Sequence, residues 1–139
     1  GTWKTYYQSG QLKQTANYLN DKLDGECKSY DENGKLQEES NYIAGKLNGI
    51  WKTYYQSGQL KQIANYLNDK LEGECKSYYE SGKLQEETNY INDKLEGISN
   101  QYREDTGFAV YKIYYKKGVK VRQIAYNKYG GILSDQKFK

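Results

Sequence analysis

The sequence predicts an all-β fold, an elongated single-layer antiparallel β-meander solenoid of 24-residue β-hairpin repeats. Gly1, Gly25, Gly49, Gly73 and Gly97 lie 24 residues apart, and the segments that they open are nearly identical. A fixed period of this size indicates a stack of identical supersecondary units. Tyrosine supplies 17 residues while hydrophobic types together reach only 36%, so the chain has too few apolar residues for a thick core.

We expect a single repeat domain over residues 1–139. Its intact units are 1–24, 25–48, 49–72 and 73–96, followed by a degenerate unit at 97–121 and a degenerate capping unit at 122–139. Residues 1–48 and 49–96 differ at only 9 of 48 positions, so a 48-residue duplication lies on top of the 24-residue period. Atypical terminal units commonly cap solenoids, and we therefore expect residues 97–139 to close the stack.

Each unit is expected to form two strands and two tight turns, because turn glycines separate segments rich in Tyr, Thr, Trp and Ile. Glycine takes the positive φ that hairpin turns require. The glycines of the first turns are Gly10, Gly34, Gly58 and Gly82. A second turn follows each Asn-Tyr pair, first at Asn20-Asp21. The glycine after each second turn, first Gly25, is expected to mark a bulge or bend; the others are Gly49, Gly73 and Gly97.

The register of the first strand pair is predicted from the residues that recur in every unit. A three-residue loop with glycine in a bulge pairs Tyr6 with Leu12, and places Tyr6, Leu12, Ala16 and Tyr18 on one face. A two-residue loop at Asn20-Asp21 then pairs Tyr18 with Leu23. The recurring positions predicted to pack unit on unit are Tyr6, Tyr30, Tyr54, Tyr78, Leu12, Leu36, Leu60 and Leu84.

Catalysis, metals and cofactors find no support in the residue pattern. Histidine is absent, no Ser or Cys has an evident base, and no phosphate-binding loop or metal-spaced cluster occurs. We therefore expect no catalytic residue, no metal site and no cofactor. The adjacent acids Glu38-Glu39 and Glu86-Glu87 point to opposite faces of a strand and are interpreted as solvated repeat positions.

Charge is distributed unevenly, with a net −3 over residues 1–96 and +6 over 97–139. A basic patch of Lys116, Lys117, Lys120 and Arg122 would suit nucleic acid or an anionic membrane, but lysine also keeps exposed strands soluble. The acidic residues through 1–96 count against nucleic acid. A membrane surface stays open as a partner, and the oligomeric state is not predicted.

Protein binding is the better-supported function, because a stacked sheet presents repeated aromatic side chains as columns. The predicted binding residues, on the face opposite the Tyr6 column, are Trp3, Tyr7, Trp51, Tyr55 and Tyr79. Such columns give large contact area at low entropic cost, although the same rings would also stack on each other across strands. Trp and Cys alternate at the third position of the unit, and this alternation favours Trp3 and Trp51 as paired anchors for a ligand along the sheet.

The segments Gly1–Lys13 and Gly49–Lys61 read Gly-x-Trp-Lys-x-Tyr-Tyr-x-x-Gly-x-Leu-Lys and are followed by Asn-Tyr and Lys-Leu-x-Gly. This motif resembles the bacterial MORN-repeat variant (MORN-2) of the YwqK-type antitoxin family. The resemblance implies a non-catalytic hairpin-repeat scaffold with a protein partner, plausibly of the toxin-antitoxin or immunity type. Eukaryotic MORN proteins are linked to membranes, which implies an alternative: a structural, adhesion-type or cell-envelope scaffold. The chain begins with Gly1 and contains no Met, so we expect a piece of a longer protein and leave its localisation open.

Overall fold

The computed structural model describes all residues 1–139 as one antiparallel sheet of 14 strands without helices. Twelve strands follow one another in chain order, while the two-residue strands β5 and β10 extend the pairing of β4 and β9. The strands are β1 (Thr2–Tyr6), β2 (Leu12–Leu19), β3 (Lys22–Tyr30), β4 (Leu36–Ile43), β5 (Lys46–Leu47), β6 (Gly49–Tyr54), β7 (Leu60–Leu67), β8 (Lys70–Tyr78), β9 (Leu84–Ile91), β10 (Lys94–Leu95), β11 (Gly97–Tyr102), β12 (Ala109–Lys116), β13 (Val119–Tyr126) and β14 (Ile132–Lys137). The predicted all-β meander of two strands per unit is confirmed, and no helix that would cross a membrane is present.

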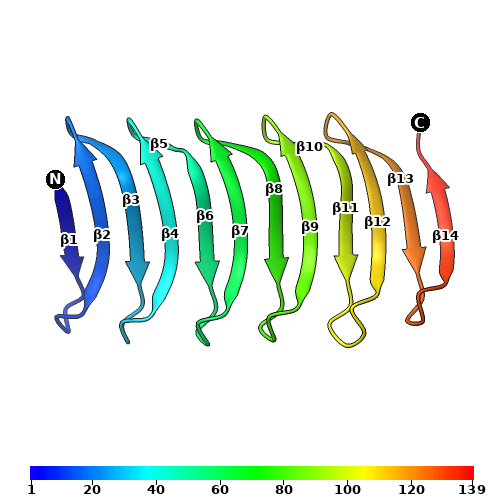
Figure 1. The fold of residues 1–139 in the computed structure, drawn as a ribbon, viewed down its shortest axis with the longest axis horizontal. Coiled ribbons are helices and arrows are strands. Elements are labelled where there is room, and N and C mark those ends of the chain that lie inside the picture. Colours follow the sequence, from blue (N-terminus) through cyan, green and yellow to red (C-terminus); the bar gives the residue numbers. More distant parts are fainter.

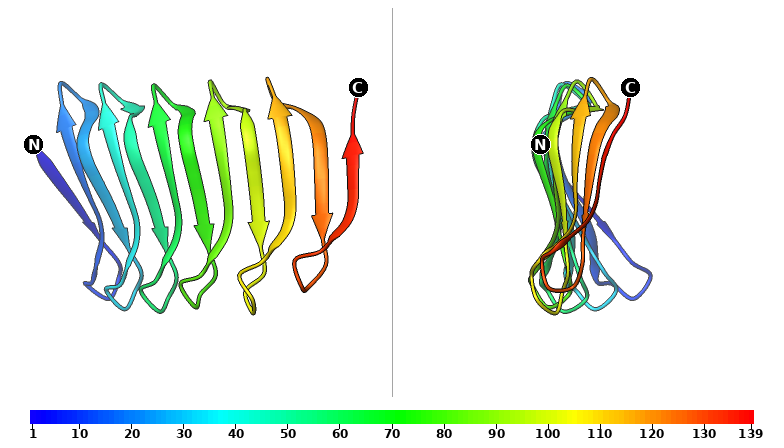
Figure 2. Two further views of the ribbon diagram at one scale, coloured as in Figure 1. Left: turned by 45° about the vertical axis from the view of Figure 1, so that its right-hand side comes forward. Right: turned by 90° about the vertical axis from the view of Figure 1, so that its right-hand side faces the viewer.

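The hairpins stand side by side in chain order, with the two termini at opposite ends of the array and the turns along two opposite edges (Figure 1). Seen along the array, the strands superimpose into a single layer that bends along its length (Figure 2). No other element covers either face of the sheet. Both faces are therefore available for contacts outside the chain.

Both turn predictions are confirmed by the backbone. Gly10 has φ +88°, and its N–H donates to the Tyr7 carbonyl at 2.9 Å, while the Tyr7 N–H donates to Gln11. Asn20 and Asp21 have φ +49° and +60° and connect the pair Leu19–Lys22, as a two-residue type I′ turn requires. Two residues capable of left-handed backbone therefore close each second turn.

The expected bulge at Gly25 is also present. Ala16 pairs with Cys27 while Tyr18 pairs with Leu23, so β3 has extra residues against β2, and Gly25 has φ +101°. A Cβ added at Gly25 would lie 3.4 Å from that of Asn17. Glycine therefore supplies both the backbone conformation and the space that this bulge needs.

The predicted grouping of side chains by face is wrong in one respect. Tyr6 pairs with Leu12 as expected, but the register shifts again between Thr5 and Tyr6, leaving Lys13 without a partner. Trp3 consequently lies directly opposite Ala16, so Ala16 shares its face with Trp3 and not with Tyr6. Tyr18, two residues after Ala16 on the same strand, also lies on the face of Trp3.

Only nine of the 139 residues are buried, and seven of these lie in a single row across the strands. The buried members of this row are Ala16, Cys27, Ser40, Ala64, Thr88, Ser99 and Ile113. Cross-strand pairs connect them to one another and to Trp3 and Trp51. Cys75 pairs with both Ala64 and Thr88 in the same row. We call the seven buried residues, Cys75, Trp3 and Trp51 the tryptophan row, and their side of the sheet the tryptophan face. The opposite side, which carries Lys28, Glu39, Lys52, Lys76 and Glu87, is the lysine face.

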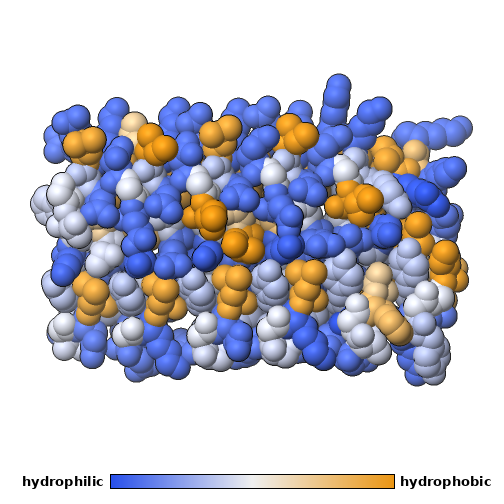
Figure 3. Space-filling model, in the orientation of Figure 1, coloured by the Kyte–Doolittle hydropathy of each residue, from blue (hydrophilic) through white to orange (hydrophobic).

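The surface view shows apolar groups in two rows near the turns, with a mostly hydrophilic band between them that holds a few further apolar groups (Figure 3). Exposed apolar residues recur with the repeat at Leu19, Ile43, Leu67 and Ile91, between 51% and 60% exposed. Isolated residues of this kind are normal on a surface. The sheet thus gains its order from pairing and repeated side-chain contacts more than from a core.

Units two and three, and units four and five, are joined by tyrosine–glutamate hydrogen bonds. The Tyr54 hydroxyl donates to Glu39 Oε2 at 2.6 Å, and the Tyr102 hydroxyl donates to Glu87 Oε1 at 2.6 Å. Burial, followed by the bond to the carboxylate, raises the pKa of both Tyr54 and Tyr102 to about 12. Both phenols therefore stay protonated in the folded chain over a pH range in which they would ionise in the unfolded chain.

We expect this pair of bonds to make stability fall between about pH 10 and pH 12. In this window the unfolded tyrosines lose a proton that the folded ones keep, so rising pH favours unfolding. At pH 9 the urea midpoint of the wild type should exceed that of a Tyr54→Phe/Tyr102→Phe variant. At pH 11 this difference between the two proteins should be smaller. A Tyr6→Phe variant is the control, because Tyr6 is 58% exposed. Equal pH slopes for all three proteins would contradict the assignment.

Candidate binding surface

Three parallel rows of side chains form the tryptophan face, and cross-strand pairing fixes each of them. The tryptophan row runs along the middle. On the side of the first turns lies a polar row of Thr5, Gln14, Ser29, Glu38, Thr53, Gln62, Ser77, Glu86 and Gln101. On the other side lie tyrosines of every second strand, Tyr18, Tyr42, Tyr66, Tyr90 and Tyr115. Glu38 and Glu86 are the only ionisable carboxylates in these three rows.

The tyrosine row arises because each Asn-Tyr motif places its tyrosine beside a glycine of a neighbouring strand. Gly25 pairs with Tyr42, and Gly49 pairs with Tyr66. Burial raises the pKa of both Tyr66 and Tyr90, so these hydroxyls remain neutral donors and acceptors. The sequence reasoning missed this row as a surface feature because it assigned Tyr18 to the opposite face.

Each tryptophan makes an edge-to-face contact with a member of the tyrosine row. The ring centres of Trp3 and Tyr18 are 6.1 Å apart at 71°, and those of Trp51 and Tyr66 are 6.3 Å apart at 81°. Such geometry is favourable for aromatic pairs. Trp3 is 67% exposed and lines a cavity of about 350 Å³ with Thr5, Gln14, Ala16, Tyr18 and Asp21. The two tryptophans thus make the same aromatic contact, although Trp3 lies on the edge strand and Trp51, with a strand on each side, is less exposed.

Small residues flank Trp51 on both neighbouring strands. Ala64, directly opposite, is 1% exposed, and Ser40, on the adjoining strand β4, is 2% exposed. Because these side chains are short, the indole has room beside the sheet. The row thus has short side chains on both sides of Trp51, and Cys27 and Cys75 occupy the equivalent position in units two and four.

The other three predicted binding residues lie at the first-turn edge and connect successive units. The hydroxyls of Tyr7, Tyr55 and Tyr79 each donate at 2.7 Å to a backbone carbonyl of the following unit. The acceptors are Tyr30, Tyr78 and Tyr102. Lys13 and Lys61 place their Nζ atoms 5.6 Å from the ring centres of Tyr7 and Tyr55. The structure thus separates these tyrosines from the tryptophans and gives them a bond between repeats.

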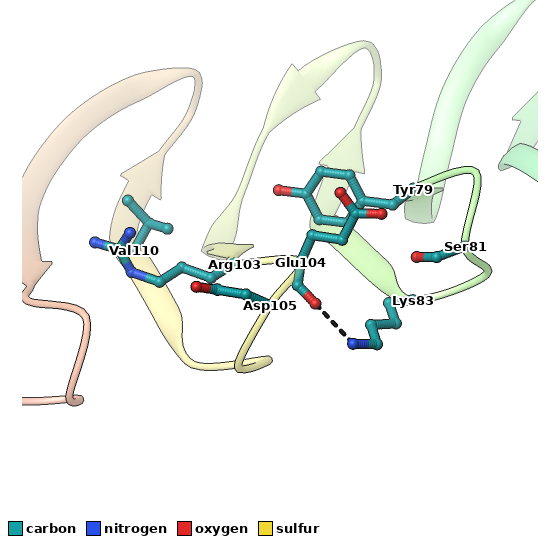
Figure 4. A pocket seen from close by; sticks show the side chains of 7 residues that line it. All are labelled: Tyr79, Ser81, Lys83, Arg103, Glu104, Asp105 and Val110. Carbon is teal, nitrogen blue, oxygen red and sulfur yellow. Dashed lines mark hydrogen bonds between the residues drawn. The ribbon is translucent and has the colours of Figure 1, made fainter.

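A cavity of about 580 Å³ lies between the first turns of units four and five (Figure 4). Tyr79, Ser81 and Lys83 enter it from one turn, whereas Arg103, Glu104, Asp105 and Val110 come from the next. Lys83 Nζ donates to the Glu104 carbonyl at 2.9 Å, and charges of both signs line the walls. Sequence reasoning missed this cavity, because it depends on how two successive turns lie in space.

The remaining chemistry of the chain is modest. No group of His, Cys, Asp or Glu is arranged to hold a metal ion, and Cys27 and Cys75 are free thiols. The predicted basic patch is divided, because Arg122 donates two hydrogen bonds to Asp135 and Lys120 donates to Gln123. What the surface offers is therefore aromatic area and hydrogen-bonding groups on one face, with charged groups on the other.

A family profile described as a MORN repeat variant matches residues 1–20, 23–44, 47–68 and 71–92, which is more than half of the chain. Each match spans one hairpin, from β1–β2 to β8–β9, and the last two hairpins lie outside the matched segments. No curated protein matches the chain.

Proposed function

Because the chain belongs to the MORN repeat variant family, we propose that it is a scaffold that binds another protein across the tryptophan face. Repeats of this family generally form scaffolds that bind proteins or membranes. The observation that carries the proposal is that Trp3 and Trp51 lie in one row and that each makes an edge-to-face contact with a tyrosine of the neighbouring row. Four strand spacings separate them, about 19 Å at roughly 4.8 Å each.

The character of the two faces supports this choice. The tryptophan face joins aromatic rings to hydrogen-bonding groups that, apart from the carboxylates of Glu38 and Glu86, are neutral, a combination that concentrates binding energy in protein interfaces. Lysines and glutamates dominate the centre of the lysine face, where Lys28 bonds Glu26 and Lys76 bonds Glu74. Charged residues of this kind are depleted at the centre of interfaces. We place the partner on the tryptophan face, with Trp3 and Trp51 as anchors and Tyr7, Tyr55 and Tyr79 on its first-turn side.

The partner that we propose is a toxin-type or immunity-type protein, following the resemblance of the repeat to antitoxins. A scaffold for membrane or cell-envelope attachment is the alternative, and the same assay distinguishes it. Trp3 and Trp51 are the only tryptophans, so intrinsic fluorescence reports directly on the proposed surface. Titration with a toxin, if one is encoded beside this protein's gene, should shift the emission to shorter wavelength, whereas anionic vesicles should leave it unchanged.

We expect a Trp3→Ala/Trp51→Ala variant to lose partner binding by calorimetry, because single anchors at interface centres are worth about 2 kcal/mol or more each. The matched control is Thr2→Ala/Ile50→Ala, which changes the preceding residue of each strand on the lysine face. The control should bind as the wild type does. Loss of binding in the control alone would place the interface on the lysine face and refute the proposal.

A further inference from the structure

The second hairpin lacks the tyrosine that connects other hairpins to their successors. In hairpins one, three and four this tyrosine directly follows the first strand, and its hydroxyl donates to a carbonyl of the next unit. Hairpin two has Asp31 in the same place. The first turns of hairpins two and three are therefore joined without a phenol ring between them.

Asp31 is 6% exposed, and its two carboxylate oxygens have different surroundings. Oδ1 accepts the backbone N–H groups of Asn33 and Lys35, both at 2.9 Å, and this fixes the orientation of the carboxylate. Oδ2 is buried and has no hydrogen-bond partner. A buried carboxylate oxygen without a donor is costly, so this atom favours a ligand that brings one.

A cavity of about 220 Å³ lies at this position, between the first turns of hairpins two and three. Its lining residues are Asp31, Lys35, Leu36, Gln37, Tyr54, Tyr55, Gln56 and Lys61. The Tyr54 carbonyl is the equivalent of the carbonyls that accept a phenol hydroxyl elsewhere in the chain. Both cationic side chains have other contacts, since Lys35 Nζ donates to the Gln56 carbonyl at 2.8 Å and Lys61 Nζ lies near the Tyr55 ring.

We propose that this cavity, the Asp31 socket, binds a guanidinium group. A guanidinium is flat like the phenol ring that fills the equivalent place in other hairpins, and its several N–H donors match two acceptors, Asp31 Oδ2 and the Tyr54 carbonyl. Its charge also neutralises a buried carboxylate, and charge-assisted bonds of this kind are strong. The socket contains neither Trp3 nor Trp51, although Tyr55, which we place on the first-turn side of the partner surface, is one of its lining residues.

The test is a titration of the full chain, labelled with ¹⁵N, with butylguanidinium and separately with the peptide acetyl-Gly-Arg-Gly-amide. Saturable shifts are expected for the amides of Asn33 and Lys35, which bond to Asp31. The equivalent amides of Ser57 and Gln59, in a turn that has Tyr55, serve as an internal control and should not move. Tighter binding of the peptide would identify an arginine side chain as the ligand. Tighter binding of butylguanidinium would instead identify a free small molecule.

Two variants that preserve the fold make the test decisive. Asp31→Asn keeps the turn, because Asn127 Oδ1 accepts the same two backbone donors, from Tyr129 and Gly131, in hairpin six. Its loss of charge should weaken binding by about tenfold or more. Asp31→Tyr introduces the residue of hairpins three and four, so it should fill the socket, raise the melting temperature and abolish the shifts. Absence of saturable shifts, or equal affinity in all three proteins, would overturn the proposal.

Discussion

Deletion of residues 49–96 is expected to leave a folded protein of four hairpins. The deletion joins Asn48 to Gly97, and the new junction reproduces one that the structure already contains. Glu86 and Glu87 of β9 pair with Gln101 and Asn100 of β11. In the deletion variant Glu38 and Glu39 of β4 take their places, and Glu39 becomes the acceptor for the Tyr102 hydroxyl.

The effect of the deletion on unfolding can be predicted from the linear architecture, because each unit contacts only its neighbours. The denaturant m-value should fall to roughly two-thirds of that of the full chain, because it scales with the surface exposed on unfolding. Circular dichroism shows whether the variant is folded, and urea unfolding followed by the same signal gives its m-value. Deletion of residues 49–84 is the control, because it removes one and a half units and brings strands of the wrong register together. If the in-register deletion unfolds the chain and this control does not, the repeats are not interchangeable.

The period and the turns were predictable because each depends on local chemistry. Glycine at position 10 of the unit and Asn, Asp or Gly in the second turn are favoured by positive φ, which few other residues adopt readily, although Ala44 and Lys117 also take it here. The bulge at Gly25 was predictable for a related reason, since Leu23 and Tyr30 are an odd number of residues apart and glycine is the natural site for a break in the alternation between them. Local conformational restrictions of this kind limit which residues can occur at a position, so they can be predicted from a single sequence.

The arrangement of side chains on the two faces was only partly predictable. The second bulge leaves Lys13 unpaired, and a lysine is acceptable in many strand positions, so nothing in the sequence singles it out. One extra residue exchanges the faces of everything beyond it. The roles of Tyr7 and Asp31 were hidden for a different reason, because their partners lie in the next unit and depend on how turns stack.

Ala64→Leu is expected to lower the free energy of unfolding by about 1–3 kcal/mol, the usual cost of overfilling a packed site. Ala64 is 1% exposed and lies between Trp51 and Cys75 in the tryptophan row. A larger side chain there displaces the indole from its place beside the sheet. Asn65→Leu is the matched control, because Asn65 is exposed on the lysine face one residue away, and its effect should stay within about 0.5 kcal/mol.

The double variant Trp51→Ala/Ala64→Leu separates packing from binding. If Trp51 packs against Ala64, removing the indole makes room for leucine, and the two changes should be less costly together than their sum by about 0.5 kcal/mol or more. Urea unfolding of the four proteins gives this interaction free energy. Strictly additive effects would show that Trp51 does not pack against its neighbours in the row. Binding alone would then have to explain why tryptophan occurs at both position 3 and position 51. A strong coupling would instead explain why the small residues Ala64 and Ser40 flank the indole. Whether the same ring also contacts a partner is then measured by the calorimetric test of partner binding.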